Sequence, residues 1–95
     1  MPHYAIHCID KPHAEELRAE TRAVHLDHVR AAGDRVLLGG PLLDDAGTPI
    51  GSLLIVDFDS RKDALEFAAR DPYAQAGLFA SVAVTLWRQV FPERG

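Results

Sequence analysis

Hydrophobic and polar residues follow one another along the first third of the chain in a pattern that predicts a strand and a long helix. His3 to Ile9 mixes polar and apolar residues on both alternating sets, and Asp10-Lys11-Pro12 then ends the strand. From His13 to Ala32 there is no glycine or proline, most residues are good helix formers, and Gly33 follows at the C′ position. The apolar residues of this helix form no single stripe.

Three further strands are predicted in the rest of the chain. Arg35 to Leu38 is a short strand that stops at Gly39-Gly40-Pro41, where the glycines let the backbone turn or approach another group closely. Ile50 to Asp59 reads as a strand with apolar residues on both faces. Leu78 to Phe91 is the last strand, and it too is apolar on both alternating sets.

A second, shorter helix is predicted between the last two strands. Ser60 is a good N-cap, and the acidic Asp63 suits the first turn of a helix, so the helix should run from Arg61 to about Arg70. Its inward residues are expected to be Leu65, Ala68 and Ala69.

The order β-α-β-β-α-β predicts an α+β, ferredoxin-like sandwich, in which a four-stranded antiparallel sheet carries both helices on one face. Two of the strands are apolar on both sides, so something should cover the helix-free face. A second copy of the sheet is the simplest cover, and a homodimer in the form of a dimeric α+β barrel is expected.

Composition limits the classes of partner. The 95 residues are 47% hydrophobic and carry a net charge of −4 without a basic cluster, so one globular domain over 1–95 is expected and neither nucleic acid nor a membrane surface is an expected partner. No apolar run approaches the roughly 20 residues that span a bilayer. With the lone Cys8 and no apparent leader segment, a cytoplasmic location is the default.

His25 is the main candidate for chemistry on the long helix. Arg22, one turn earlier, places a permanent cation beside the imidazole, which favours the neutral ring of a general base and an anionic substrate. Alternatively, Arg22 is solvated or pairs with Glu20 or Asp27, and His25 is simply half-buried. His25 and His28 are three residues apart and could chelate a metal, but no third ligand is evident, so no metal and no cofactor is expected.

Asp71-Pro72-Tyr73 follows the second helix and has two interpretations. Asp71 can cap a short helical turn that Pro72 starts, or it can orient a catalytic imidazole by accepting its N–H. One carboxylate is not expected to do both easily. Tyr73 could donate a hydrogen bond to a substrate oxygen or be a core aromatic residue with a polar tip.

Two backbone features indicate a cleft without indicating a nucleotide or a hydrolase. Gly39-Gly40-Pro41 lacks the lysine and serine or threonine of a phosphate-binding loop, so Gly40 is a candidate for lining a cleft. Ser52 could contact a ligand, but no nucleophile-elbow pattern surrounds it.

Several short motifs occur in order along nearly the whole chain: Arg22-x-x-His25-Leu26, Gly33, Leu38-Gly39-Gly40-Pro41, Gly51-Ser52, Phe58, Asp71-Pro72-Tyr73 and Gly77. Together they resemble the YciI-like (YCII-related domain) proteins. The resemblance implies a dimeric α+β barrel and a cleft in which His25 and Asp71 form a pair. One branch of that family is a dehydrochlorinase acting on a chlorinated hydroxyquinol, which implies His25 as general base, Asp71 as its orienting partner, and Ser52 and Tyr73 as substrate contacts.

The resulting hypothesis is a cofactor-independent enzyme of lyase, dehydrochlorinase or isomerase type that removes a proton from a small anionic or phenolic cyclic substrate. Catalysis is expected from His25 and Asp71, and substrate binding from Arg22, Gly40, Ser52, Tyr73 and His7, the last of which lies outside the family pattern. The alternative is a non-catalytic ligand-binding or accessory module with the same cleft. Haem or oxygen chemistry is a minor third option.

Overall fold

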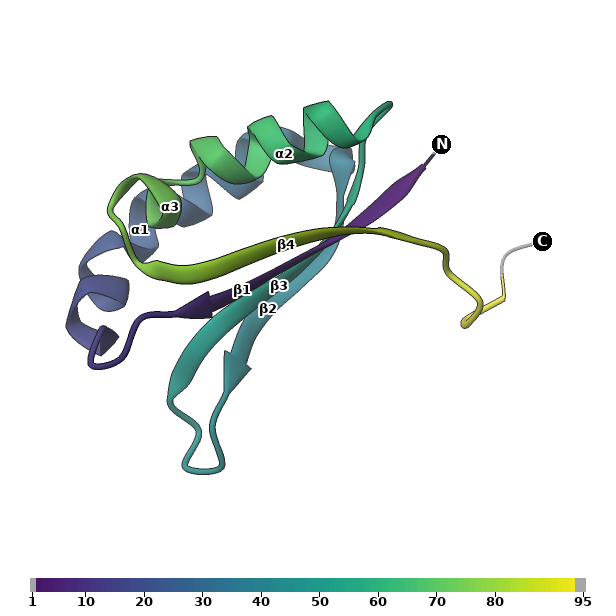
Figure 1. The fold of residues 1–95 in the computed structure, drawn as a ribbon. Coiled ribbons are helices and arrows are strands. Elements are labelled where there is room, and N and C mark those ends of the chain that lie inside the picture. Colours follow the sequence, from purple (N-terminus) through teal and green to yellow (C-terminus); the bar gives the residue numbers. More distant parts are fainter. Residues whose placement is uncertain (1, 94–95) are drawn as a thin grey trace.

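The computed structural model describes residues 2–93 and contains the predicted order of elements (Figure 1). The strands are β1 (His3–Asp10), β2 (Val36–Leu43), β3 (Pro49–Asp57) and β4 (Phe79–Trp87). The helices are α1 (Glu15–Ala32), the 3-10 turn η1 (Gly33–Arg35), α2 (Arg61–Arg70) and α3 (Pro72–Gln75). The predicted domain 1–95 includes Met1, Arg94 and Gly95, which lie outside the described residues.

The four strands form one antiparallel sheet in the order β2-β3-β1-β4, and the helices lie over one of its faces (Figure 1). This confirms the ferredoxin-like α+β fold. Cys8 lies opposite Ser52 on β3 and Val82 on β4, and alternate residues from there point toward the helices. The core between the layers is built from Tyr4, Ile6, Cys8, Leu54, Val56, Ala64 and Ala68.

The prediction that the second strand stops at Leu38 is wrong, because β2 continues through both glycines and Pro41 to Leu43. The strand lies at the edge of the sheet and pairs only with β3, and an edge strand tolerates proline. At Gly39, a Cβ atom would overlap the Leu54 side chain. The glycine therefore provides a close approach within the strand and not a turn.

The long helix begins at Glu15 and not at His13, which lies in the preceding turn with a φ of 58°. Its buried residues are Arg18 and His25, whereas Val24 is exposed. The inward side of α1 therefore carries polar groups, which explains why the sequence shows no clean apolar stripe.

The bounds predicted for the second helix are confirmed by α2, and Ser60 caps it by accepting a hydrogen bond from the backbone N–H of Asp63 at 3.2 Å. Two of its predicted inward residues, Leu65 and Ala69, are exposed. Ala64 and Ala68, which are four residues apart, are the buried ones. The helix therefore packs with the small side chains of one narrow face.

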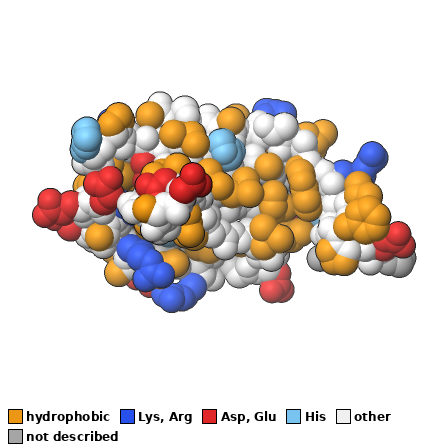
Figure 2. All heavy atoms as spheres, turned by 90° about the horizontal axis from the view of Figure 1, so that it is seen from below, with side chains coloured by type: hydrophobic (Ala, Val, Ile, Leu, Met, Phe, Trp, Pro, Cys, Tyr) orange, Lys and Arg blue, Asp and Glu red, His pale blue; other side chains and the backbone are white. Residues whose placement is uncertain are grey.

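The last strand ends at Trp87 and not at Phe91. On the helix-free face of the sheet, hydrophobic side chains gather among polar ones (Figure 2). Ile9 and Leu38 are exposed, and their strand register places them on this face. Within residues 2–93, no helix is both long and apolar enough to cross a membrane. The expected cytoplasmic location, the homodimer and the lack of nucleic-acid or membrane partners stay predictions.

Candidate functional site

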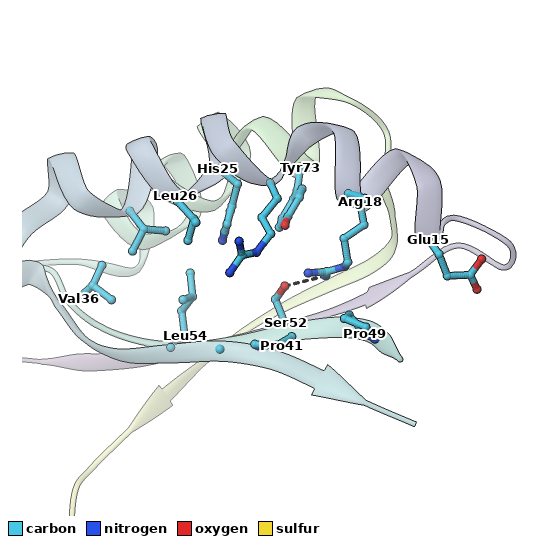
Figure 3. Close-up of a pocket in the computed structure, with 15 residues that line it drawn as sticks. Glu15, Arg18, His25, Leu26, Val36, Pro41, Pro49, Ser52, Leu54 and Tyr73 are labelled. Atoms are coloured by element: carbon cyan, nitrogen blue, oxygen red, sulfur yellow. Dashed lines mark hydrogen bonds between the residues drawn. The ribbon is translucent and has the colours of Figure 1, made fainter. Parts of the chain in front are cut away.

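A pocket of about 330 Å³ lies between α1 and the strands β2 and β3 (Figure 3). Its polar lining residues are Glu15, Arg18, Arg22, His25, Ser52 and Tyr73. Its other lining residues are Ala19, Leu26, Val29, Val36, Gly39, Gly40, Pro41, Pro49 and Leu54. An apolar cavity with a few polar groups is the usual form of a small-molecule site.

The structure brings His25 and Asp71 together although 46 residues separate them in the chain. Nδ1 of His25 lies 2.8 Å from Oδ1 and 3.0 Å from Oδ2 of Asp71, and both side chains are buried. An ionised carboxylate can only accept a hydrogen bond, so Nδ1 carries a proton and donates it. The neutral imidazole then has its lone pair on Nε2, and the His25 ring points into the pocket (Figure 3).

Asp71 also caps the short helix α3, because its Oδ1 accepts the backbone N–H of Tyr73 at 2.9 Å. The expectation that one carboxylate would not easily serve both as a cap and as the partner of an imidazole is therefore wrong. Pro72 occupies the first helical position and directs the chain so that the two donors reach the same carboxylate. The cap fixes the carboxylate within hydrogen-bond distance of Nδ1 of His25.

Tyr73 is a buried aromatic residue that also lines the pocket, so its predicted role as a donor to a substrate oxygen stays a prediction. Its ring stacks on His25 with centroids 4.0 Å apart, and the guanidinium carbon of Arg18 lies 4.5 Å from its centroid. Burial raises the pKa of the Tyr73 hydroxyl, and the positive charges of Arg18 and Arg22 oppose this rise without cancelling it. At neutral pH the hydroxyl is therefore protonated and can donate.

Arg18 and Asp10, which the sequence analysis did not single out, form a buried ion pair next to the pocket. Nε and Nη2 of Arg18 donate to the two carboxylate oxygens of Asp10 at 2.7 and 2.9 Å, and Nη2 also donates to Oγ of Ser52 at 2.8 Å. Burial by itself would lower the pKa of the Arg18 guanidinium, but Asp10 and Tyr73 together outweigh this effect and the pKa is raised. The missed signal was a charged residue seven positions before His25, which is two helical turns and thus the same face.

Arg22 contributes positive charge to the pocket. Within residues 2–93, no hydrogen bond or ion pair joins it to Glu20 or Asp27, and Asp27 instead accepts from Arg30 at 3.4 Å. Since no hydrogen bond or ion pair among the described residues holds its guanidinium, Arg22 can reach an anionic ligand in the pocket that it lines.

Two of the remaining candidates are placed differently from one another. Gly40 lines the pocket, and a Cβ atom there would meet nothing within 4 Å. His7 pairs with Leu53 and Ala83 and lies on the helix-free face, because its neighbours Ile6 and Cys8 point toward the helices. The structure therefore does not bring His7 to this pocket.

The imidazole rings of His25 and His28 contact different partners and do not converge on one metal ion. Nε2 of His28 lies 3.1 Å from the carbonyl oxygen of Phe67, and the His28 ring stacks on that of Phe67 with centroids 4.4 Å apart. His28 thus joins α1 to α2 while His25 faces Asp71. Among the described residues, no group of three or more His, Cys, Asp or Glu side chains is placed to hold one metal ion.

Known proteins of similar sequence cover almost the whole chain. An uncharacterized protein of Haemophilus influenzae is 34% identical over 97 residues, which cover 94% of this chain and 99% of that protein. Protein YciI of Escherichia coli is 33% identical and is covered to 98%, with 93% of this chain aligned.

Among solved structures, 5-chloro-2-hydroxyhydroquinone dehydrochlorinase (TftG) from Burkholderia phenoliruptrix, in complex with 2,5-dihydroxybenzoquinone, matches with a TM-score of 0.84 and 30% identity, covering 90% of this chain and 93% of that one. An antibiotic biosynthesis monooxygenase shares only the fold, with a TM-score of 0.58 and 14% identity over 95% of this chain and 99% of its own. The model of the YCII-related domain matches residues 2–88, and the chain therefore belongs to the YCII-related (YciI-like) domain family.

Proposed function

We propose that the protein is a cofactor-independent enzyme of lyase, dehydrochlorinase or isomerase type that removes a proton from a small anionic or phenolic cyclic substrate. The observation that carries this proposal is the buried contact between Nδ1 of His25 and the carboxylate of Asp71 at the wall of a pocket. The similarity to TftG, whose structure contains a quinone, favours a planar oxygenated ring as the ligand.

In the proposed reaction, Nε2 of His25 accepts the proton, and the imidazolium that forms is stabilised by the ionised Asp71. The electron pair of the broken bond to hydrogen forms a new double bond in the ring. In a lyase, the leaving group departs with its own bonding pair, and in an isomerase His25 returns the proton to another atom of the substrate. The cation of Arg22 lowers the energy of the negative charge that develops on the ring oxygens.

The test uses the wild type and the His25→Ala variant with two probes taken from the dehydrochlorinase. Chloride release is measured from 5-chloro-2-hydroxyhydroquinone, and exchange of the ring hydrogens of 2,5-dihydroxybenzoquinone is followed by proton NMR in heavy water. Loss of a general base lowers a rate by about 10² to 10⁴-fold, and this loss is expected in His25→Ala while His13→Ala, an exposed control, keeps the wild-type rate. Wild-type rates in His25→Ala would contradict the mechanism.

The alternative, a ligand-binding module without turnover, is favoured by one observation. Asp71 has a complete structural role as the cap of α3, so its presence does not require catalysis. Tight binding of 2,5-dihydroxybenzoquinone with no exchange or chloride release, in the wild type as in His25→Ala, would support this alternative.

We further propose that the protein forms a homodimer through the helix-free face of the sheet. Support comes from the exposed Ile9 and Leu38 on that face, which a second copy would bury. Ala83 points to the same face, so Ala83→Glu should yield a monomer in sedimentation analysis, whereas Ala69→Glu on the exposed side of α2 should not. A monomeric wild type would contradict the proposal.

A further inference from the structure

The ion pair of Arg18 and Asp10 is buried, although the burial of charged side chains is energetically unfavourable. The side chains are 8% and 6% exposed, and taking an ion out of water costs several kcal/mol. A pair of apolar residues of similar volume would fill the space without that cost. The contacts that the guanidinium makes beyond Asp10 therefore indicate what the charge does.

One of these contacts fixes the direction of a hydroxyl group. Nη2 of Arg18 lies 2.8 Å from Oγ of Ser52, and arginine has donors only, so Ser52 accepts in this bond. A serine hydroxyl also has one proton to donate, and among the hydrogen bonds within residues 2–93 Ser52 donates to no protein acceptor. Because Ser52 is buried and lines the pocket, its proton is available to a ligand there.

The second contact joins Arg18 to the ring that supports His25. Tyr73 lies between Arg18 and His25, with the guanidinium carbon 4.5 Å from its centroid and the imidazole centroid 4.0 Å away (Figure 3). Ser52 is on β3 and His25 on α1, so the donor and the base belong to the two opposite layers that enclose the pocket.

We propose that Arg18, held by Asp10, is a positioning residue that keeps the Ser52 hydroxyl as a hydrogen-bond donor toward the pocket. Ser52 then selects ligands that present a negatively charged oxygen, a carboxylate or a phenolate, to the strand side of the pocket. The choice of ligand in this inference rests on the proposed function. In that function, the charged oxygen of the substrate lies at Ser52, across the pocket from the substrate atom whose proton His25 removes. A charged acceptor strengthens the bond relative to a neutral one, which gives the selection.

The experiment measures binding and not turnover. Affinities for benzoate and for benzamide, which have nearly the same shape but differ in charge, are determined by titration calorimetry for the wild type, Ser52→Ala, Arg18→Lys and the double variant. Lysine keeps the positive charge near Asp10 but cannot hold both Asp10 and Ser52 in one plane. We expect the preference for benzoate to fall about tenfold, which is about 1.4 kcal/mol, in each single variant.

The double variant decides the matter, because residues that act through one another are not additive. If Arg18 acts through Ser52, the double variant loses no more preference than Ser52→Ala alone. Losses that multiply to about a hundredfold, or an equal loss of benzoate and benzamide binding in Arg18→Lys, would overturn the inference and indicate a structural role. A wild type without preference for benzoate would overturn it as well.

Two controls keep the result interpretable. Arg30→Lys changes an exposed arginine of the same helix outside the pocket and should leave the preference unchanged. If Arg18→Lys does not fold, the double variant Asp10→Leu with Arg18→Met removes both buried charges and should show the same loss of preference. The proposed function is tested by a different measurement, the rates of His25→Ala, so a failure of that proposal can be distinguished from a failure of this inference.

Discussion

Replacing Asp71 with asparagine is expected to move the proton of His25 from one ring nitrogen to the other. In the wild type, Oδ1 of Asp71 accepts the backbone N–H of Tyr73, and Nδ1 of His25 lies 2.8 Å from Oδ1 and 3.0 Å from Oδ2. Because the Tyr73 N–H needs an acceptor at the Oδ1 position, the amide nitrogen of an asparagine takes the Oδ2 position. Nδ1 of His25 then lies 3.0 Å from an amide N–H donor, while the retained oxygen, 2.8 Å away, already accepts the Tyr73 N–H. The tautomer with the proton on Nε2 is favoured because it avoids two donors facing each other. The base toward the pocket is then lost.

The contacts give the size of the effect on stability. Asparagine is as good an N-cap as aspartate, so Asp71→Asn loses mainly the charge of one hydrogen bond, about 1 kcal/mol. Asp71→Ala loses the cap, about 1 kcal/mol, and a charged hydrogen bond of about 1.5 to 3 kcal/mol. A loss of 1 kcal/mol lowers the thermal midpoint of a domain of this size by about 4 to 8 °C. The midpoint should therefore fall by about 4 to 8 °C in Asp71→Asn and by about 10 °C or more in Asp71→Ala.

Long-range nitrogen–proton NMR identifies the protonated nitrogen of His25 without a substrate, and ring-hydrogen exchange of 2,5-dihydroxybenzoquinone reports the activity. We expect Nδ1–H in the wild type, Nε2–H in Asp71→Asn, and a loss of exchange comparable to that of His25→Ala. A wild-type His25 protonated on Nε2, or an Asp71→Asn variant that keeps both the tautomer and the exchange rate, would refute the reasoning.

Three further predictions concern residues around the site. Burial, followed by the charges of nearby carboxylates, raises the pKa of the Cys8 thiol from 9.0 to about 12, so alkylation of Cys8 at neutral pH should require unfolding. Denaturant titrations should show that the contribution of Cys8 to the free energy of unfolding is fully present below about pH 9 and is lost as the pH rises toward 12. Gly39→Val should weaken benzoate binding because the new side chain displaces that of Leu54, which lines the pocket. Gly40→Ala should bind benzoate as the wild type does, because a Cβ atom there meets nothing within 4 Å. His28→Ala leaves the Phe67 carbonyl without its partner and should cost about 1 to 3 kcal/mol in unfolding measurements, with benzoate affinity unchanged.

Local signals in the sequence predicted some elements well and others poorly. The helix over 61–70 was predicted with its bounds because Ser60 starts it and Asp71-Pro72 ends it, and both signals act within a few residues. The strand that was predicted to stop at Leu38 continues to Leu43, since its tolerance of glycine and proline depends on lying at the sheet edge beside the Leu54 side chain. A neighbour across the sheet is not visible in a local pattern.

In the candidate site, too, some residues could be predicted from the sequence and others only from their neighbours in the fold. His25, Arg22 and Ser52 could be singled out by residue type and by resemblance to a family, and the structure places all three at one pocket. Arg18 and Asp10 were missed, because a charged residue on a helix is usually solvated and only the packing of α1 on the sheet buries this one. His7 was included on residue type, but strand alternation directs it to the opposite face.

By itself the sequence determined the order of the elements, the class of fold and the residue types that could do chemistry, because hydrophobic periodicity, caps and turn residues act over short distances along the chain. Only the tertiary structure decided that one carboxylate serves two donors and that a buried guanidinium donates to a serine hydroxyl at the wall of a pocket. The contacts of His25 with Asp71 and of Arg18 with Ser52 join residues 46 and 34 positions apart, and their geometry depends on how the helices pack on one another and on the sheet.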